Sequence, residues 1–274
     1  MSTTFGSDPI ARTTPAPRLR WLLPALQTAQ WWLAPLALAA LWWQASAHGW
    51  VSAQLLVPPS RAWATALDLW RDGELQQNVL ITLHRLATGF AWGASSGALC
   101  GLLLARSRTF ADYVQPLFDL VRQVPTLTLI PVLILLIGID EPLKVVVVAK
   151  AVFFPVALGA RTGVRDVPRD LLEMARHYGL GRAALLRDVI VPAACAPLLT
   201  GVRIALARAW LALVAVELLA ADSGIGEMME LARQMLRIDV VLVDVFVIGL
   251  IGFLLDQLLA LAQRWTTRWQ SPSR

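Results

Sequence analysis

The sequence predicts an all-α, polytopic integral membrane protein with about six transmembrane helices, and three observations support this fold class. Apolar residues make up 57% of the chain and charged residues 16%, against roughly 45 to 50% and about 25% in average soluble proteins. Apolar segments long enough to span a bilayer recur along the chain. The arginines concentrate in the connections on one side of these segments, as they do in cytoplasmic loops.

The first 77 residues are predicted to form a tail, an anchor and a surface helix. Residues 1–30 are read as a cytoplasmic tail because their first part is rich in Ser, Thr, Pro and Arg. Residues 31–47 form the first span, flanked by tryptophans that suit membrane interfaces. A cleavable secretory signal ending at Ala45-Ser46-Ala47 is the alternative, and the later spans favour a retained anchor.

Residues 48–77 are predicted to be a periplasmic amphipathic segment. Trp63, Leu67 and Trp70 recur there at helical spacing, which favours a helix lying along the outer membrane surface. Residues 78–264 form the predicted permease core, and residues 265–274 a second cytoplasmic tail.

The second span, about 83–105, carries a glycine at every fourth position. These residues form a smooth strip along one helix face, where another helix can approach closely. The strip consists of Gly89, Gly93, Gly97 and Gly101. Packing within the chain and packing against another subunit both explain such a strip.

The third span is predicted to be broken. Phe110–Val124 is amphipathic and ends before Pro125, and the apolar run 127–139 is interrupted by Pro131. The second run is too short to cross about 30 Å of hydrocarbon alone, so the two are expected to cross together. The last three spans are predicted at about 143–160, 196–220 and 240–262, with a polar loop and a short helix at 222–239.

The arginine distribution predicts the orientation. Fourteen arginines fall on one side of the six predicted spans and four on the other. Since the arginine-rich side is normally cytoplasmic, both termini and the loop 161–195 are predicted to face the cytoplasm.

A polar stretch at 167–192, here called the knob, stands out within that loop. Asp170 is predicted to cap a short helix with Glu173 as its capping-box partner, and Gly179 to end that helix in the left-handed conformation. A second short helix is predicted from about Arg182, and Pro192 is expected to block its continuation. Helices this short are marginal alone, so we expect another protein to hold the knob.

The spacing within the knob resembles the cytoplasmic "EAA" loop of the membrane-spanning subunits of bacterial ABC importers. That family has Glu-Ala-Ala, a Gly, and then Ile-x-Leu-Pro, and three positions depart from the pattern here with apolar replacements. The residues at the motif positions are Glu173, Met174, Ala175, Gly179, Val189, Val191 and Pro192, and the three departures are Met174, Val189 and Val191. From about Trp31 to Trp269 the chain is similar in order and length to the branch that imports nitrate, taurine and other alkanesulfonates.

The resemblance implies a type I permease in the bacterial inner membrane that translocates a small anion such as an alkanesulfonate, taurine or nitrate. It implies two ATP-binding subunits, a periplasmic solute-binding protein and a second permease copy, expected as a homodimer. ATP and Mg²⁺ would be bound by the partner ATPase. Loop 161–195 would couple this ATPase to the permease. For Glu173, a helix cap and a contact with the ATPase are both compatible.

The sequence argues against an enzyme. Both lysines, Lys144 and Lys150, lack the Gly-rich turn of a P-loop, and the three histidines lack metal-binding spacing. Because a basic stretch interleaved with aromatic residues is also missing, a nucleic-acid partner is not expected. We therefore predict no catalytic residues, no cofactor and no metal on this chain.

Charges within the predicted spans are candidates for a pathway or gate, since an ionisable group in hydrocarbon is costly unless paired or hydrated. Arg122 is the candidate for contact with an anion, and Arg208 is expected in a buried ion pair. Glu217 has two alternative roles, a structural bond between helices and a part in the pathway or gate. Three further charges are expected to reach the membrane interface: Lys150, Asp244 and Asp256.

Two other functions compete with the importer. An ion-gradient-driven secondary transporter would show inverted repeats with paired broken helices, and a second copy of the 125–131 break is not evident. A membrane docking or sensor protein would use the knob without transport.

Overall fold

The computed structural model describes residues 22–50, 52 and 56–266, and within these the side chains of 22–32, 169, 182 and 266 are not described. The predicted tails fall largely outside the described residues. Every regular element in the described part is helical, which confirms the all-α prediction. The chain divides into two compact units, Met1–Ser60 and Arg61–Arg274.

The first unit contains the helix α1 (Leu22–Ala47). It begins inside the stretch predicted as a tail. Its apolar part, Leu33–Ala47, is shorter than the other candidate spans. After a turn, the indole Nε1 of Trp42 donates a hydrogen bond to the Val57 carbonyl over 3.1 Å, which ties the following segment to the helix.

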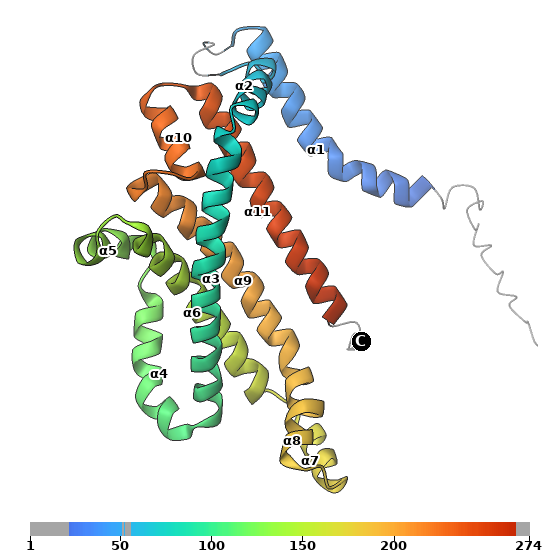
Figure 1. Ribbon diagram of the computed structural model, residues 1–274. Coiled ribbons are helices and arrows are strands. Elements are labelled where there is room, and N and C mark those ends of the chain that lie inside the picture. Colours follow the sequence, from blue (N-terminus) through green and yellow to red (C-terminus); the bar gives the residue numbers. More distant parts are fainter. Residues whose placement is uncertain (1–21, 51, 53–55, 267–274) are drawn as a thin grey trace, which may run out of the picture. The chain divides into compact units, whose positions relative to one another are not determined.

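Three long helices form the core of the second unit (Figure 1): α3 (Glu74–Arg106), α6 (Glu141–Arg165) and α9 (Val191–Ala220). Helix α6 packs against both of the others. Its residues Leu143, Val147 and Val152 are completely buried. A helix that is apolar around most of its circumference is typical of such a central position.

Small residues allow this close packing. The glycine strip of α3 lies against α6, so it packs within the chain. A Cβ added at Gly97 would lie 2.5 Å from the Phe153 carbonyl oxygen. On the other side of α6, a Cβ added at Gly201 would lie 2.6 Å from the Pro155 carbonyl oxygen. The backbones therefore approach at distances that any side chain would prevent.

The helix breaks at Pro125, as the sequence predicts. Helix α4 (Arg108–Gln123) is followed by a 3₁₀ turn (Leu127–Leu129) and α5 (Ile130–Ile137), and the two parts are bent by 86°. Pro131 does not interrupt the apolar run, which corrects that expectation. It lies in the first turn of α5, where a missing N–H removes no helical hydrogen bond.

Helices α10 (Ile225–Gln234), α11 (Ile238–Thr266) and α2 (Pro59–Arg71) complete the described elements that pack around the core. Leu69 of α2 belongs to an apolar cluster with Leu75, Met228 and Val240. The α2 residues Trp63 and Trp70, predicted to contact the membrane surface, are exposed.

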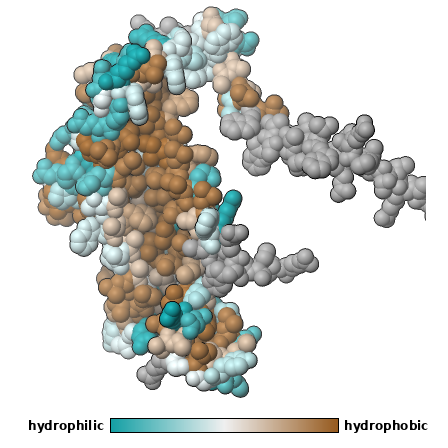
Figure 2. Space-filling view, turned by 45° about the vertical axis from the view of Figure 1, so that its right-hand side comes forward, coloured by the Kyte–Doolittle hydropathy of each residue, from teal (hydrophilic) through white to brown (hydrophobic). Residues whose placement is uncertain are grey.

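The described part contains four helices long and apolar enough to span a membrane, and the bent pair makes five if it counts as one span. Figure 2 shows the corresponding surface of the second unit: apolar side chains cover its long helices, and hydrophilic residues gather towards the ends.

Candidate functional site

The knob begins with α7 (Arg169–His177), which starts directly after Pro168. Pro168 occupies the N-cap position and a side-chain cap is not formed, so the prediction that Asp170 caps this helix with Glu173 is wrong. Because Pro168 already fixes an extended conformation before the helix, Asp170 lies inside the first turn. There its negative charge favours the helix N-terminus without a capping bond.

Gly179 closes α7 as expected. Its φ of 67° lies in the left-handed region. The Leu180 N–H donates to the Ala175 carbonyl over 3.0 Å, and the Gly179 N–H donates to the Arg176 carbonyl over 3.0 Å. This pair of bonds is a Schellman motif, which satisfies the last carbonyls of the helix.

The second half of the knob runs without a break into the long apolar helix α9. Helix α8 (Arg182–Ala184) leads into a π-helical segment (Leu185–Ile190), and α9 follows at Val191. Pro192 does not block the helix, contrary to the expectation. The Val191 N–H bonds to the Leu186 carbonyl, five residues back, and this wider turn accommodates a residue that cannot donate. Residues 185–220 therefore form one helical run.

The apolar face of α7 is uncovered in the isolated chain. Ala175 is 3% exposed, but Leu171, Met174 and Tyr178 are 43%, 55% and 80% exposed. Of the other motif residues, Glu173 and Val191 are exposed and Val189 is half-buried. The knob therefore presents large apolar side chains on a helix too short to be stable by itself.

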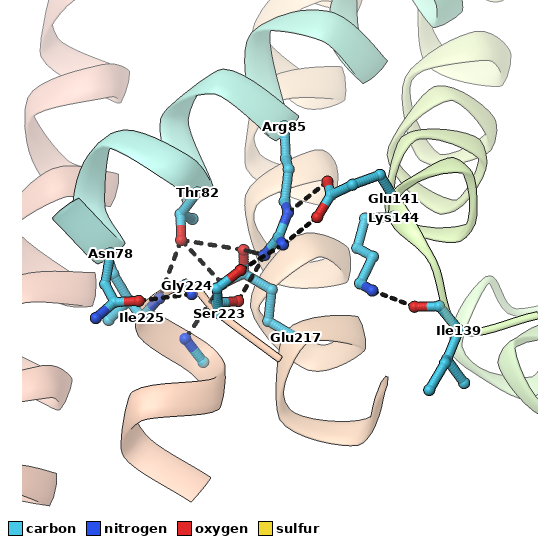
Figure 3. A network of polar contacts seen from close by, with 11 residues as sticks. Asn78, Thr82, Arg85, Ile139, Glu141, Lys144, Glu217, Ser223, Gly224 and Ile225 are labelled. Atoms are coloured by element: carbon cyan, nitrogen blue, oxygen red, sulfur yellow. Dashed lines mark hydrogen bonds and ion pairs between the residues drawn. The ribbon is translucent and has the colours of Figure 1, made fainter. Parts of the chain in front are cut away.

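A buried polar network lies at the end of the bundle far from α7 and α8 (Figures 1 and 3), centred on Arg85 of α3 and Glu217 of α9. The Arg85 Nη1 donates to Glu217 Oε1 over 2.9 Å, and the two side chains are 2% and 0% exposed. Arg85 Nε also donates to Glu141 Oε2 over 2.8 Å, and Nη2 forms a second contact with this carboxylate. Arg85 Nη1 donates to the Ser223 carbonyl over 2.6 Å.

The same network holds the start of α10. The N–H groups of Gly224, Ile225 and Gly226 donate to Asn78 Oδ1, Thr82 Oγ1 and Glu217 Oε2 over 2.7, 3.0 and 3.1 Å. The Thr82 hydroxyl lies 3.0 Å from both Glu217 oxygens.

Glycine is required at two of these positions. Gly224 has φ 104°, and a Cβ there would lie 2.5 Å from Glu217 Oε1. A Cβ at Gly226 would lie 2.6 Å from the Glu217 Cβ. Four orphan N–H groups at a helix N-terminus need acceptors, and the network supplies three.

The prediction singled out Glu217 but missed its partner. Arg85 lies within the predicted second span, and its charge there is the signal that could have found it, since a buried arginine requires an acid. The geometry gives Glu217 a structural bond between helices. Spacing along the chain could not supply the pairing, because Arg85 and Glu217 belong to different helices.

The other membrane charges differ from expectation in several places. Arg208 is exposed, and an ion pair to it is not found among the described residues, so the expected buried pair is wrong. Asp256 forms an ion pair with Arg203 on the neighbouring helix over 2.7 Å, with both side chains partly exposed, and its position at the interface stays a prediction. Lys150 donates inward to the Val124 carbonyl over 2.7 Å, and Asp244 is buried. In each case tertiary neighbours, rather than distance from the helix end, set the position.

Arg122 lies at the end of α4, 3.5 Å from Asp119. It lines two open grooves together with Arg208. Among the described residues, clusters of three or more His, Cys, Asp or Glu that could hold a metal are not found.

Comparisons with known proteins identify the same family along most of the chain. The family described as "Binding-protein-dependent transport system inner membrane component" matches residues 93–268. The putative aliphatic sulfonates transport permease protein SsuC of Escherichia coli is 38% identical over 249 residues, which cover 91% of this chain and 90% of SsuC.

Two further relatives are named for other substrates. The taurine transport system permease protein TauC of Escherichia coli is 34% identical over 80% of this chain and 82% of TauC. The bicarbonate transport system permease protein CmpB of Synechococcus elongatus is 30% identical over 72% of this chain and 71% of CmpB.

Proposed function

Because this chain belongs to the family of inner membrane components of binding-protein-dependent transport systems, we propose that it is the permease subunit of an ABC importer for a small anion. The cargo we favour is an alkanesulfonate or taurine, with nitrate or another small oxyanion as the wider class. The relatives named for aliphatic sulfonates and taurine support this choice. The relative named for bicarbonate supports the wider class.

The proposed assembly contains two copies of this chain, two ATP-binding subunits and a periplasmic solute-binding protein. ATP and Mg²⁺ are bound by the ATP-binding subunits. The chain crosses the inner membrane several times with both termini in the cytoplasm, as the arginine bias indicates. The connection between α3 and α4 lies at the same end of the bundle as α7 and α8 (Figure 1). It contains Arg106 and Arg108, so this is the arrangement that the topology requires.

The observation that carries the proposal is the uncovered face of α7. Met174 and Tyr178 are large, apolar and more than half exposed, on the segment that resembles the loop gripped by the ATPase in ABC importers. Burial of such side chains in a partner's groove stabilises the complex by the hydrophobic effect. The Schellman motif at Gly179 keeps this face in a fixed orientation relative to the π-helical segment.

The continuous helical run 185–220 explains how movement of the knob reaches the other side of the membrane. When the ATP-binding subunits close, they move the knob as a rigid body, and α9 moves with it because the helical run continues through Pro192. Glu217 lies near the far end of α9, where it binds Arg85 of α3. Displacement of α9 therefore acts on the contacts that hold α10 and the outer end of the bundle.

The decisive test is a substitution on the exposed face of α7. The full-length chain is co-expressed in turn with ATP-binding subunits of its source organism and purified in detergent. Met174→Glu places a charge in the proposed apolar contact, so the subunit that the parent chain retains should be lost. Arg176→Gln is the matched control, because Arg176 is exposed on the opposite face of the same helix and should retain the subunit.

Three outcomes would each contradict the proposal. If Met174→Glu retained the ATP-binding subunit and ATP-driven uptake as well as Arg176→Gln, α7 would not be the coupling contact. If uptake in proteoliposomes ran without ATP and collapsed with an uncoupler, a secondary transporter would replace the importer. Labelling of an Arg176→Cys variant from the periplasmic side would refute the topology.

A further inference from the structure

Two open grooves lie side by side along α4, α6 and α9, with volumes of 610 and 260 Å³. Arg122 and Arg208 line both, so the two grooves adjoin at these residues. Lys150 lines the smaller groove. The larger one has room for a small anion and several waters, since one water takes about 30 Å³ in the liquid.

The charge of the grooves is one-sided. They contain the side chains of Arg122, Lys150 and Arg208, and their described lining residues include no acid. Asp119, 3.5 Å from Arg122, is the one carboxylate within ion-pair distance of these cations among the described residues. Gln123, Thr162 and Thr200 add neutral polar groups to the larger groove. A positive concave surface of this kind raises the local concentration of anions.

The cations lie deep in the membrane part of the chain. Lys150 is nine residues from Glu141 on α6, and Arg208 is nine residues from Glu217 on α9. At 1.5 Å per residue both lie about 14 Å along their helices from the carboxylates of the outer network. Arg85 binds both carboxylates, so the network sets a common level and the two cations lie at a similar depth.

These side chains cannot face lipid without a compensating partner. Arg208 shares the outer face of α9 with Ile204 and Leu211, which are 46% and 71% exposed. A charge at this depth is costly unless it meets water or an opposite charge. The Lys150 ammonium donates one hydrogen bond to the Val124 carbonyl and a second, over 3.3 Å, to Thr126 Oγ1. An ammonium has three N–H donors, so one is left for a ligand.

We propose that Arg122, Lys150 and Arg208 form an anion-binding station halfway along the translocation path, which receives a sulfonate or similar oxyanion. The station rests on the proposed function, because it supplies the membrane-embedded site for the small anionic cargo. The two guanidinium groups bind the oxyanion by charge-assisted hydrogen bonds. Lys150 also fixes the loop after α4, and thereby positions Arg122.

A thiol-accessibility experiment tests the station independently of transport. In the full-length chain with Cys100→Ser and Cys195→Ala, Thr200→Cys places a thiol on the wall of the larger groove. It is treated with sulfonatoethyl methanethiosulfonate, which carries an ethanesulfonate group, and with its cationic trimethylammonioethyl analogue. Each rate is divided by the rate of the same reagent with free cysteine.

The anionic reagent is expected to be favoured at Thr200→Cys by about tenfold or more. Adding Arg122→Gln and Arg208→Gln should abolish the preference, and Arg208→Lys alone should preserve most of it. Equal normalised rates for the two reagents, or a thiol that neither reagent reaches, would overturn the station.

Uptake measurements then connect the station with transport. In proteoliposomes with the ATP-binding subunits and the loaded solute-binding protein, Arg208→Gln should lower ATP-driven uptake of radiolabelled ethanesulfonate about tenfold. The ATPase activity should be retained, because the knob is unchanged. Uptake equal to that of the parent would contradict the station. If the parent itself showed no ATP-driven uptake, the proposed function would fail, while the thiol assay would still report on the groove.

Discussion

Arg85 and Glu217 lie on different helices, 132 residues apart in sequence, and form an ion pair of 2.9 Å in which neither side chain is more than 2% exposed. Removing one partner of such a pair leaves a buried charge without compensation. We therefore expect Arg85→Met to lower the free energy of unfolding by about 3 to 5 kcal/mol, measured as a reduced thermal midpoint in detergent.

The double variant Arg85→Met, Glu217→Gln should recover much of that loss, since it removes the unpaired buried charge while the amide oxygen can still accept from the Gly226 N–H. Arg233→Met is the matched control, because Arg233 pairs with Glu230 on the exposed part of α10. An Arg85→Met midpoint as high as that of Arg233→Met would show that the buried pair does not stabilise the fold.

Substitution by alanine is expected to change stability in opposite directions at Gly97 of the α3 glycine strip and at Gly249 of α11. Gly97→Ala forces a Cβ to within 2.5 Å of the Phe153 carbonyl oxygen, and such overpacking costs about 1 to 3 kcal/mol. Gly249→Ala in α11 meets no atom within 4 Å and should gain roughly 0.5 to 1 kcal/mol through helix propensity. Thermal midpoints compare the two, and a stabilised Gly97→Ala variant would refute the close contact of α3 with α6.

The end of α7 predicts a graded effect at Gly179. A Cβ there would meet open space, so the backbone conformation decides the outcome. Gly179→Val should cost more than the 1 to 2 kcal/mol or so that an ordinary residue pays in the left-handed region, whereas Gly179→Asn should be tolerated. Limited proteolysis of the knob should therefore be faster in Gly179→Val than in Gly179→Asn, together with weaker retention of the ATP-binding subunit. Equal cleavage rates would argue against the Schellman closure.

Two glutamates of α10 predict opposite pH effects. Burial, together with Asp222 and Glu74, raises the pKa of Glu227 above 4.5, so the folded state binds this proton more tightly and stability falls as pH rises past 4.5. Glu227→Gln should raise the thermal midpoint at pH 7, and this gain should disappear below about pH 4.

Hydrogen bonds from Arg233 and Gln234 lower the pKa of Glu230 to about 2. Its contribution is present above 4.5 and is lost as pH falls towards 2. Glu230→Gln should therefore lower the midpoint slightly at pH 7, since the pair is exposed. Shifts of the same sign in both variants would contradict the assigned environments.

The sequence by itself determined the helical class, the break near Pro125 and the closure of α7 at Gly179. These features depend on composition and on residues close together in the chain. An apolar run requires internally satisfied hydrogen bonds in lipid, and a glycine at a helix end adopts the left-handed conformation without a Cβ penalty. The resemblance carried by Glu173 to Pro192 likewise depends on local spacing, and the family comparisons agree with it.

The tertiary structure alone decided which charges meet. Arg85 pairs with Glu217, and Asp256 pairs with Arg203. Helix packing brings these residues together although they lie far apart in sequence, and no local pattern encodes such a pairing. It also decided that helix α9 continues through Pro192, where a π-helical turn removes the conflict that a regular helix would have. Arg208 remains exposed for the same reason: its environment is set by the neighbouring helices, and among them no acid lies opposite it in the described residues.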